Sequence, residues 1–109
     1  MYHNRLKEAI GVSVQTLEQH GAVSEEIAAE MAGAVRRWAG TDIGLAETGI
    51  AGSKGASEER PAGLFYIAVA SADDVLSEKL MLDGDRSENK LACAESALRL
   101  LLRYVRRGA

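Results

Sequence analysis

The sequence predicts an α/β fold, a three-layer sandwich in which helices pack on a small mixed β-sheet. Residues 63–70 form a continuous apolar run of strand length, which is typical of a strand buried on both faces. Residues 25–39 and 87–106 carry apolar side chains at helical spacing. Because the elements follow in the order helices, three strands, helix, with no repeat or linker, we expect a single domain over residues 1–109.

Two helical segments precede the sheet. Across residues 4–20, apolar side chains recur at four-residue spacing around a glycine, and Ser13 can cap a second segment, so we expect two short helices. Residues 25–39 predict a longer helix, capped by Ser24 and closed by Gly40. The buried stripe of this longer helix is predicted to be Ile27, Met31, Ala34, Val35 and Trp38.

Three strands and a final helix complete the expected fold. Residues 43–48 predict a short inner strand, and residues 63–70 the centre of the sheet. Residues 71–74 supply turn chemistry, after which residues 75–82 are expected to form a hairpin with the central strand. Residues 87–106 predict the last helix. Its predicted buried face is Leu91, Ala94, Leu98, Leu101, Leu102 and Val105.

Composition narrows the range of partners. With 13 Lys and Arg against 16 Asp and Glu, the net charge of −3 disfavours nucleic acid as a partner. The single cysteine, Cys93, excludes an intrachain disulfide and fits a reducing compartment. No stretch of about 18 uncharged apolar residues occurs, so we expect no membrane contact and a cytoplasmic protein.

The most informative segment for function is the loop at residues 48–57, which holds three glycines and three hydroxyl residues after a predicted strand. Glycines allow backbone N–H groups to converge on a phosphate or a developing oxyanion, and ligands often lie at the carboxyl ends of strands. A plain connection between two strands is the alternative interpretation.

Other candidate side chains lie outside this loop. Lys7 could act as a base for a hydroxyl nucleophile, with Tyr2 orienting it, but the residues alone favour the interpretation of both as ordinary surface side chains. Arg86 could hold a phosphate together with the first amides of the last helix, or could simply be solvated. The two histidines are too far apart in the sequence to indicate a metal site, and we expect neither a metal nor a cofactor.

Five segments together resemble the CinA C-terminal domain, a family of pyridine-nucleotide amidohydrolases. Residues 2–7 (YHNRLK) resemble the family's YSNEAK-like segment, and residues 11–25 its GV…TLE.HGAVSEE stretch. TGIAG at residues 48–52, PAGLFYIA at residues 61–68 and GDR at residues 84–86 follow in the family's order. The resemblance therefore covers essentially the whole chain.

The resemblance implies hydrolysis of the carboxamide of nicotinamide mononucleotide, which yields nicotinate mononucleotide and ammonia. It implies that Tyr2 and Lys7 are the catalytic pair and that Thr48 contacts the reacting centre. The small-molecule mononucleotide would be bound by Gly49, Ala51, Gly52, Gly55 and Arg86.

The chain also departs from the family pattern. The family's active-site serine lies in a TAESCTGG-like segment upstream of the tyrosine that is residue 2 here, so we expect a partial domain, truncated at its N-terminus and weak or inactive alone. Ser53 replaces a proline that usually follows TGIAG. The absence of upstream strands would expose a sheet edge, so we expect a homo-oligomer. Completion by a second polypeptide, a non-catalytic mononucleotide-binding remnant and an oligomerisation module remain alternatives.

Overall fold

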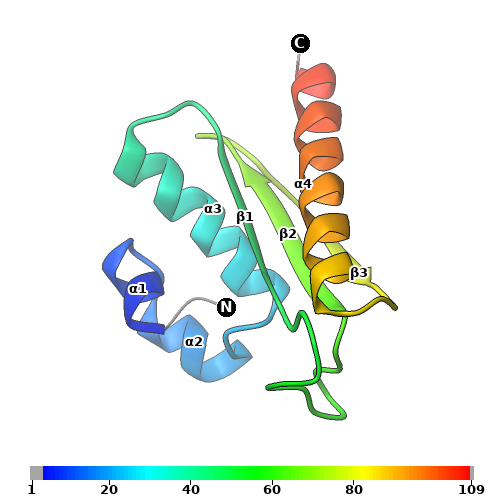
Figure 1. Ribbon diagram of the computed structural model, residues 1–109. Helices are drawn as coiled ribbons and strands as arrows, with labels where there is room; N and C mark the ends of the chain where they lie inside the picture. The colour runs from blue at the N-terminus through cyan, green and yellow to red at the C-terminus, as the bar shows by residue number, and fades with distance from the viewer. Residues whose placement is uncertain (1–3, 109) are drawn as a thin grey trace.

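The computed structural model describes residues 4–108, and its elements follow the predicted order (Figure 1). Three helices come first: α1 (Asn4–Ala9), α2 (Val14–His20) and α3 (Glu25–Ala39). They are followed by strands β1 (Gly44–Gly49), β2 (Leu64–Ala70) and β3 (Val75–Met81), and then by helix α4 (Arg86–Gly108). The predicted α/β class is therefore confirmed.

The helix boundaries depend on local capping groups that the sequence contains. Ser13 Oγ accepts a hydrogen bond from the backbone N–H of Thr16, and Ser24 Oγ accepts one from Ile27. Gly40 ends α3 in the left-handed conformation, with φ of 68°. The predicted start of α2 and both predicted ends of α3 are confirmed.

The sheet has the strand order β1-β2-β3, and both strand pairs are antiparallel. Thr48 lies opposite Tyr66, which in turn lies opposite Lys79. The described sheet is thus antiparallel throughout, where the sequence predicted a mixed sheet. The reason is that neither connection between the strands contains the crossover helix that parallel neighbours require.

Helices cover both faces of this sheet. α3 packs on one face, with α1 and α2 beside it, and α4 packs on the other (Figure 1). On the α3 side, small residues bring helix and sheet close together: Ala28 and Ala32 contact Ala68 and Ala70. A Cβ atom at Gly44 would lie 2.0 Å from the carbonyl oxygen of Ala32, so this crossing accepts only glycine.

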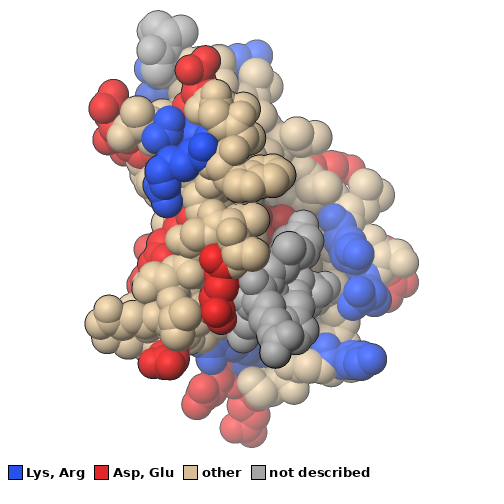
Figure 2. Space-filling view, turned by 90° about the vertical axis from the view of Figure 1, so that its left-hand side faces the viewer, with Lys and Arg blue, Asp and Glu red and all other residues tan. Residues whose placement is uncertain are grey.

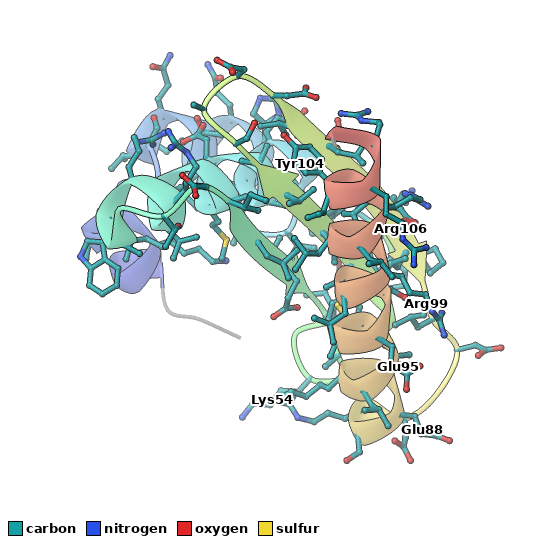
Figure 3. The ribbon with its side chains drawn as sticks, turned by 90° about the horizontal axis from the view of Figure 1, so that it is seen from above. Lys54, Glu88, Glu95, Arg99, Tyr104 and Arg106 are labelled. Carbon is teal, nitrogen blue, oxygen red and sulfur yellow. The ribbon has the colours of Figure 1, made fainter. Side chains whose placement is uncertain are left out.

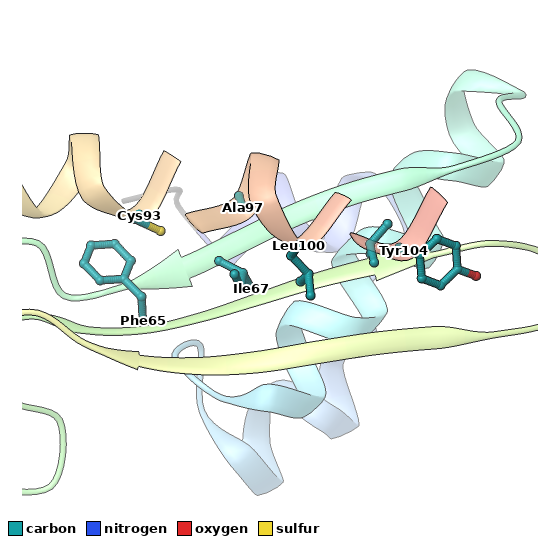
Figure 4. Packing of buried hydrophobic residues seen from close by; sticks show 7 residues of the cluster. Phe65, Ile67, Cys93, Ala97, Leu100 and Tyr104 are labelled. Carbon is teal, nitrogen blue, oxygen red and sulfur yellow. The ribbon is translucent and has the colours of Figure 1, made fainter. Parts of the chain in front are cut away.

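The main core lies between β2 and α4. Phe65 and Ile67 point from β2 toward α4 (Figure 4). Val69 belongs to the same cluster, because alternate residues of a strand face the same side. On the helix they meet Cys93, Ala97, Leu100 and Tyr104. The hydroxyl of Tyr104 is 2.6 Å from Ser71 Oγ, which satisfies the polar end of a buried aromatic ring.

The predicted buried face of α4 is wrong. Leu91, Leu98, Leu102 and Val105 are exposed, as is Ala94, and Leu101 is half-buried. α4 has two apolar stripes at helical spacing, and the sheet takes the one with the smaller residues at its start, Cys93 and Ala97, which allow close approach. Periodicity alone cannot distinguish such stripes.

Trp38 was likewise predicted to be buried and is 73% exposed. Ile27, Met31 and Ala34 are buried as predicted, and Val35 is partly buried. Trp38 lies in the last turn of α3, where its side chain stays largely exposed to solvent.

On the face that Figure 2 presents, acidic and basic side chains are interspersed, and no continuous basic patch forms there. Within the part of the chain that the structure describes, no helix is long and apolar enough to cross a membrane.

Candidate active site

The candidate site is centred on a buried lysine. Lys7 of α1 is only 1% exposed, and its Nζ donates hydrogen bonds to Thr48 Oγ1 at 3.2 Å and to the carbonyl oxygen of Ala22 at 3.3 Å. Thr48 Oγ1 donates to the same carbonyl at 2.8 Å. One carbonyl thus joins α1, the α2–α3 connection and the end of β1, and it fixes the positions of the amine and the hydroxyl.

The burial also lowers the pKa of the amine. Desolvation lowers the pKa of Lys7 from its ordinary value of 10.5, because the charged form loses hydration, and the negative charge of Glu47 opposes part of this effect. An amine with a lowered pKa has more free base at neutral pH and can accept a proton from a hydroxyl group.

A cavity of about 350 Å³ opens beside Thr48, between the end of β1, the following loop and the first turns of α4. Its lining includes three cationic side chains, those of Lys54, Arg86 and Lys90, and one carboxylate, that of Glu47. Lys54 lies beside the beginning of α4 (Figure 3). A cavity with this excess of positive charge is suited to an anionic ligand such as a phosphate ester.

Asn89 holds the walls of this cavity together. It is 1% exposed, and its Nδ2 donates to the carbonyl oxygens of Ala51 at 2.9 Å and Gly84 at 3.0 Å. Its Oδ1 accepts a hydrogen bond from the N–H of Gly84 at 3.0 Å. The glycine-rich loop and the turn before α4 are therefore fixed to the same side chain.

The loop and α4 also approach each other closely at Gly52. A Cβ atom at Gly52 would lie 3.2 Å from the Cβ of Arg86, tighter than an ordinary contact. The glycine therefore lets the loop backbone lie against the arginine.

The sequence-predicted residues are largely brought together. Lys7 contacts Thr48, while Thr48, Gly49, Ala51, Gly55 and Arg86 all line the cavity. Gly52 packs against Arg86 without lining the cavity, and Lys7 reaches it only through Thr48. Tyr2 lies outside the described residues.

Three residues at this site were missed by the sequence reasoning. Lys90 follows Arg86 by one helical turn, so the spacing could have placed both on one face. Glu47 lies in β1, next to Thr48. Nothing in the sequence indicated that Asn89 is buried, because a polar residue near the start of a helix is usually solvated.

Cys93 is a core residue, only 2% exposed. Burial and the neighbouring carboxylate of Glu47, to which the thiol lies at 3.6 Å, raise the pKa of Cys93 to about 12. A thiol of this kind is not a nucleophile at neutral pH. Among residues 4–108, no group of three or more His, Cys, Asp or Glu side chains is arranged to hold a metal ion.

Comparison with known proteins identifies the family. The model of the CinA C-terminal domain matches residues 1–105. A relative from Desulforudis audaxviator, described as a competence-damage inducible protein, is 43% identical over 109 residues, which are 99% of this chain and 26% of the relative. A CinA-like protein of Syntrophus aciditrophicus is 44% identical over 110 residues, with 99% and 26% covered. The chain thus spans about a quarter of the length of these relatives.

Solved structures give the same result. The competence/damage inducible protein CihA of Agrobacterium tumefaciens superposes with a TM-score of 0.89 at 35% identity, over 94% of this chain and 64% of that chain. A CinA superfamily protein of Escherichia coli has a TM-score of 0.89 at 32% identity, over 94% of this chain and 60% of that chain. Since the family model covers nearly all of the sequence and the folds superpose, this chain belongs to the CinA C-terminal domain family.

Proposed function

We propose that this chain is the nucleotide-binding part of an amidohydrolase that converts nicotinamide mononucleotide and water to nicotinate mononucleotide and ammonia, with little or no turnover as an isolated chain. The observation that carries the proposal is the buried contact of Lys7 with Thr48 at the edge of a cavity lined by three cations. An activated amine beside a cationic cavity suits a substrate that has a carboxamide at one end and a phosphate at the other.

The cationic wall is the proposed phosphate site. A phosphate monoester carries about −1.5 to −2 charges at pH 7, and Arg86 and Lys90 extend from the first turns of α4. Guanidinium groups bind phosphate oxygens through paired hydrogen bonds, and the N-terminus of a 23-residue helix adds a favourable dipole.

The Lys7 end is the proposed site of the carboxamide. In this role the free amine accepts a proton from the hydroxyl of the serine that the family carries in its TAESCTGG-like segment, as that oxygen attacks the carbonyl carbon, and it returns the proton to the nitrogen as the C–N bond breaks. Water then hydrolyses the resulting ester, so that the products are a carboxylate and ammonia. Thr48 would orient the amine and the amide group.

One observation favours a second candidate, nucleotide binding without hydrolysis. Among the described residues, the hydroxyl that Lys7 contacts is that of Thr48, which is buried and already donates to the carbonyl oxygen of Ala22. A hydroxyl held in this way is better placed to position a ligand than to attack it.

The free thiol of Cys93 fits a reducing compartment, and we propose the cytoplasm as the place of action.

Two assays on one preparation test the proposal: ammonia release from nicotinamide mononucleotide, and binding of the same nucleotide by calorimetry. The proposal expects binding that Arg86→Ala weakens, and any ammonia release to be lost in Lys7→Met. Binding without release would favour the second candidate. The proposal would be overturned if the folded chain neither bound nor hydrolysed the nucleotide.

A further inference from the structure

Arg60 lies in the loop between β1 and β2, and its side chain reaches a distant segment of the chain. Its Nε donates a hydrogen bond to the carbonyl oxygen of Val23 at 3.0 Å, and its Nη2 donates one to that of His20 at 2.7 Å. Its ion pair with Glu59 is weaker, because the two atoms are 3.9 Å apart and Glu59 is 88% exposed. One planar guanidinium group therefore holds two points of the connection between α2 and α3.

The guanidinium group also lies directly against the backbone that it binds. A Cβ atom at Gly21 would lie 2.9 Å from Nη2 of Arg60, and Gly21 has a positive φ of 79°. The carbonyl oxygen of Gly21 accepts a hydrogen bond from Ser24 Oγ at 3.0 Å. The path of the chain from His20 to Val23 is thus shaped to accept one flat cationic group.

The carbonyl that holds the amine of Lys7 lies between the two residues that Arg60 binds. The oxygen of Ala22 accepts hydrogen bonds from Lys7 Nζ at 3.3 Å and from Thr48 Oγ1 at 2.8 Å. Because each peptide unit is planar and only two torsions per residue can change, anchors on both sides restrict the direction of the Ala22 carbonyl. The position of the amine therefore depends on a segment that Arg60 holds.

Arg60 acts from outside the first cavity. It lines a second, separate cavity of about 560 Å³ between α2, the start of α3 and β2. The loop that carries it nevertheless forms part of the wall of the first cavity, through Ala51, Lys54 and Gly55. Within this loop the N–H of Arg60 donates to Ser57 Oγ at 3.1 Å, and its carbonyl oxygen accepts from the N–H of Ser57 at 2.9 Å. One residue thus connects the wall of the first cavity to the support of the amine.

We propose that Arg60 is a positioning residue for Lys7: by fixing residues 20–23, it holds the Ala22 carbonyl where that carbonyl can bind both the amine and the hydroxyl of Thr48. The inference concerns the group that the proposed function uses as a base. It is tested in the free chain, without a nucleotide, so its failure can be distinguished from a failure of the proposed function.

The charged neighbours of Lys7 decide how the test is interpreted. Burial is the larger cause of its lowered pKa, and Glu47 of β1 is the charged group that acts on the amine. Near the end of α2, His20 and Glu26 pair with each other at 3.6 Å, and both side chains are exposed. Since Arg60 does not act on the amine through its charge, its removal should affect Lys7 through the position of the backbone.

The test is a titration of the Lys7 amine in the 109-residue chain, followed by the chemical shift of Cε in isotope-labelled lysine. The signal that is absent from Lys7→Met belongs to Lys7. Arg60→Met keeps the length of the side chain and removes both hydrogen bonds to the backbone. Water should then reach the amine, so the pKa of Lys7 should rise toward 10.5 by about one pH unit. An unchanged midpoint would overturn the proposal.

Arg60→Lys separates the hydrogen bonds from the charge. An ammonium group keeps the charge but lacks the flat fork that reaches two carbonyls at once. The midpoint of Lys7 should therefore move in the same direction as in Arg60→Met, by a smaller amount. A midpoint equal to that of the wild type would mean that a positive charge is sufficient, and it would contradict the proposal.

Two control variants distinguish positioning from a general loss of stability. Gly40→Ala lies at the opposite end of α3 from residues 20–23 and should lower stability through backbone strain. Arg99→Met removes an arginine of α4 whose side chain is 77% exposed. Circular dichroism should show that all variants fold, and neither control should move the midpoint of Lys7. A change in Gly40→Ala as large as that in Arg60→Met would show that any loosening of the fold alters the amine, and the assignment of Arg60 would be wrong.

Discussion

The ammonium nitrogen of Lys7 lies 3.2 Å from Thr48 Oγ1, although 41 positions separate the two residues in the sequence. Both also bond to the carbonyl oxygen of Ala22. Three segments of the chain therefore meet at one buried amine, so substitutions there should change the stability of the fold together with the chemistry of the site.

Replacing Lys7 by Met should alter how stability depends on pH. The folded pKa of Lys7 is below its unfolded value of 10.5, so in the interval between them the unfolded state binds more protons and stability rises with pH. Lys7→Met should remove that rise, as measured by urea unfolding at a series of pH values. Lys79→Met, at an exposed position on β3, should keep it. Identical slopes in wild type and Lys7→Met would contradict the lowered pKa.

The hydrogen bond between Lys7 and Thr48 should appear as an energetic coupling. Thr48→Val keeps the shape of the side chain but removes the hydroxyl, and it should cost about 1–3 kcal/mol because the buried amine loses a partner. In a double-mutant cycle with Lys7→Met, the two costs should fall short of additivity by about 0.5–3 kcal/mol. Chemical denaturation of the four proteins measures this quantity. Strict additivity would mean that the contact contributes nothing.

Removing the cationic groups of the first cavity should weaken nucleotide binding. Arg86→Ala and Lys90→Ala should each raise the dissociation constant for nicotinamide mononucleotide by roughly tenfold, the loss of one charged hydrogen bond. Arg106→Ala, in the last turn of α4, is the control and should have no effect. Calorimetric titration at fixed ionic strength provides the comparison, and equal losses in all three variants would indicate a nonspecific charge effect.

The sequence predicted the elements better than the site. Ser24 and Gly40 mark the ends of α3 because caps are local interactions, and residues 63–70 revealed β2 because a strand buried on both faces is apolar throughout. The burial of Lys7 could not be read from its polar neighbours. It depends on segments that are distant in the sequence, those of Ala22 and Thr48.

The sequence also could not predict which side of α4 packs on the sheet. Two apolar stripes satisfy the helical period, and the choice of Cys93 and Ala97 over Leu91 and Leu98 depends on what lies across from the helix. The more apolar stripe was predicted to be buried and faces outward.

Gly63 should tolerate substitution much less well than Gly40. Both have positive φ, 92° and 68°, but a Cβ at Gly63 would lie 1.8 Å from the carbonyl oxygen of Leu82, whereas nothing lies within 4 Å at Gly40. Gly40→Ala should cost about 1 kcal/mol from backbone strain alone, and Gly63→Ala clearly more, because the clash would separate β2 from the residue after β3. Thermal unfolding measures both, and equal losses would show that the approach at Gly63 is not tight.

The most direct test of the account is a chemical-shift map of the isotope-labelled chain titrated with nicotinamide mononucleotide. The account predicts saturable shifts at the amides of residues 48–55 and 84–90, which border the cationic cavity, with little change along β3. No shifts, or shifts confined to other surfaces, would contradict the claim that this cavity is the nucleotide site.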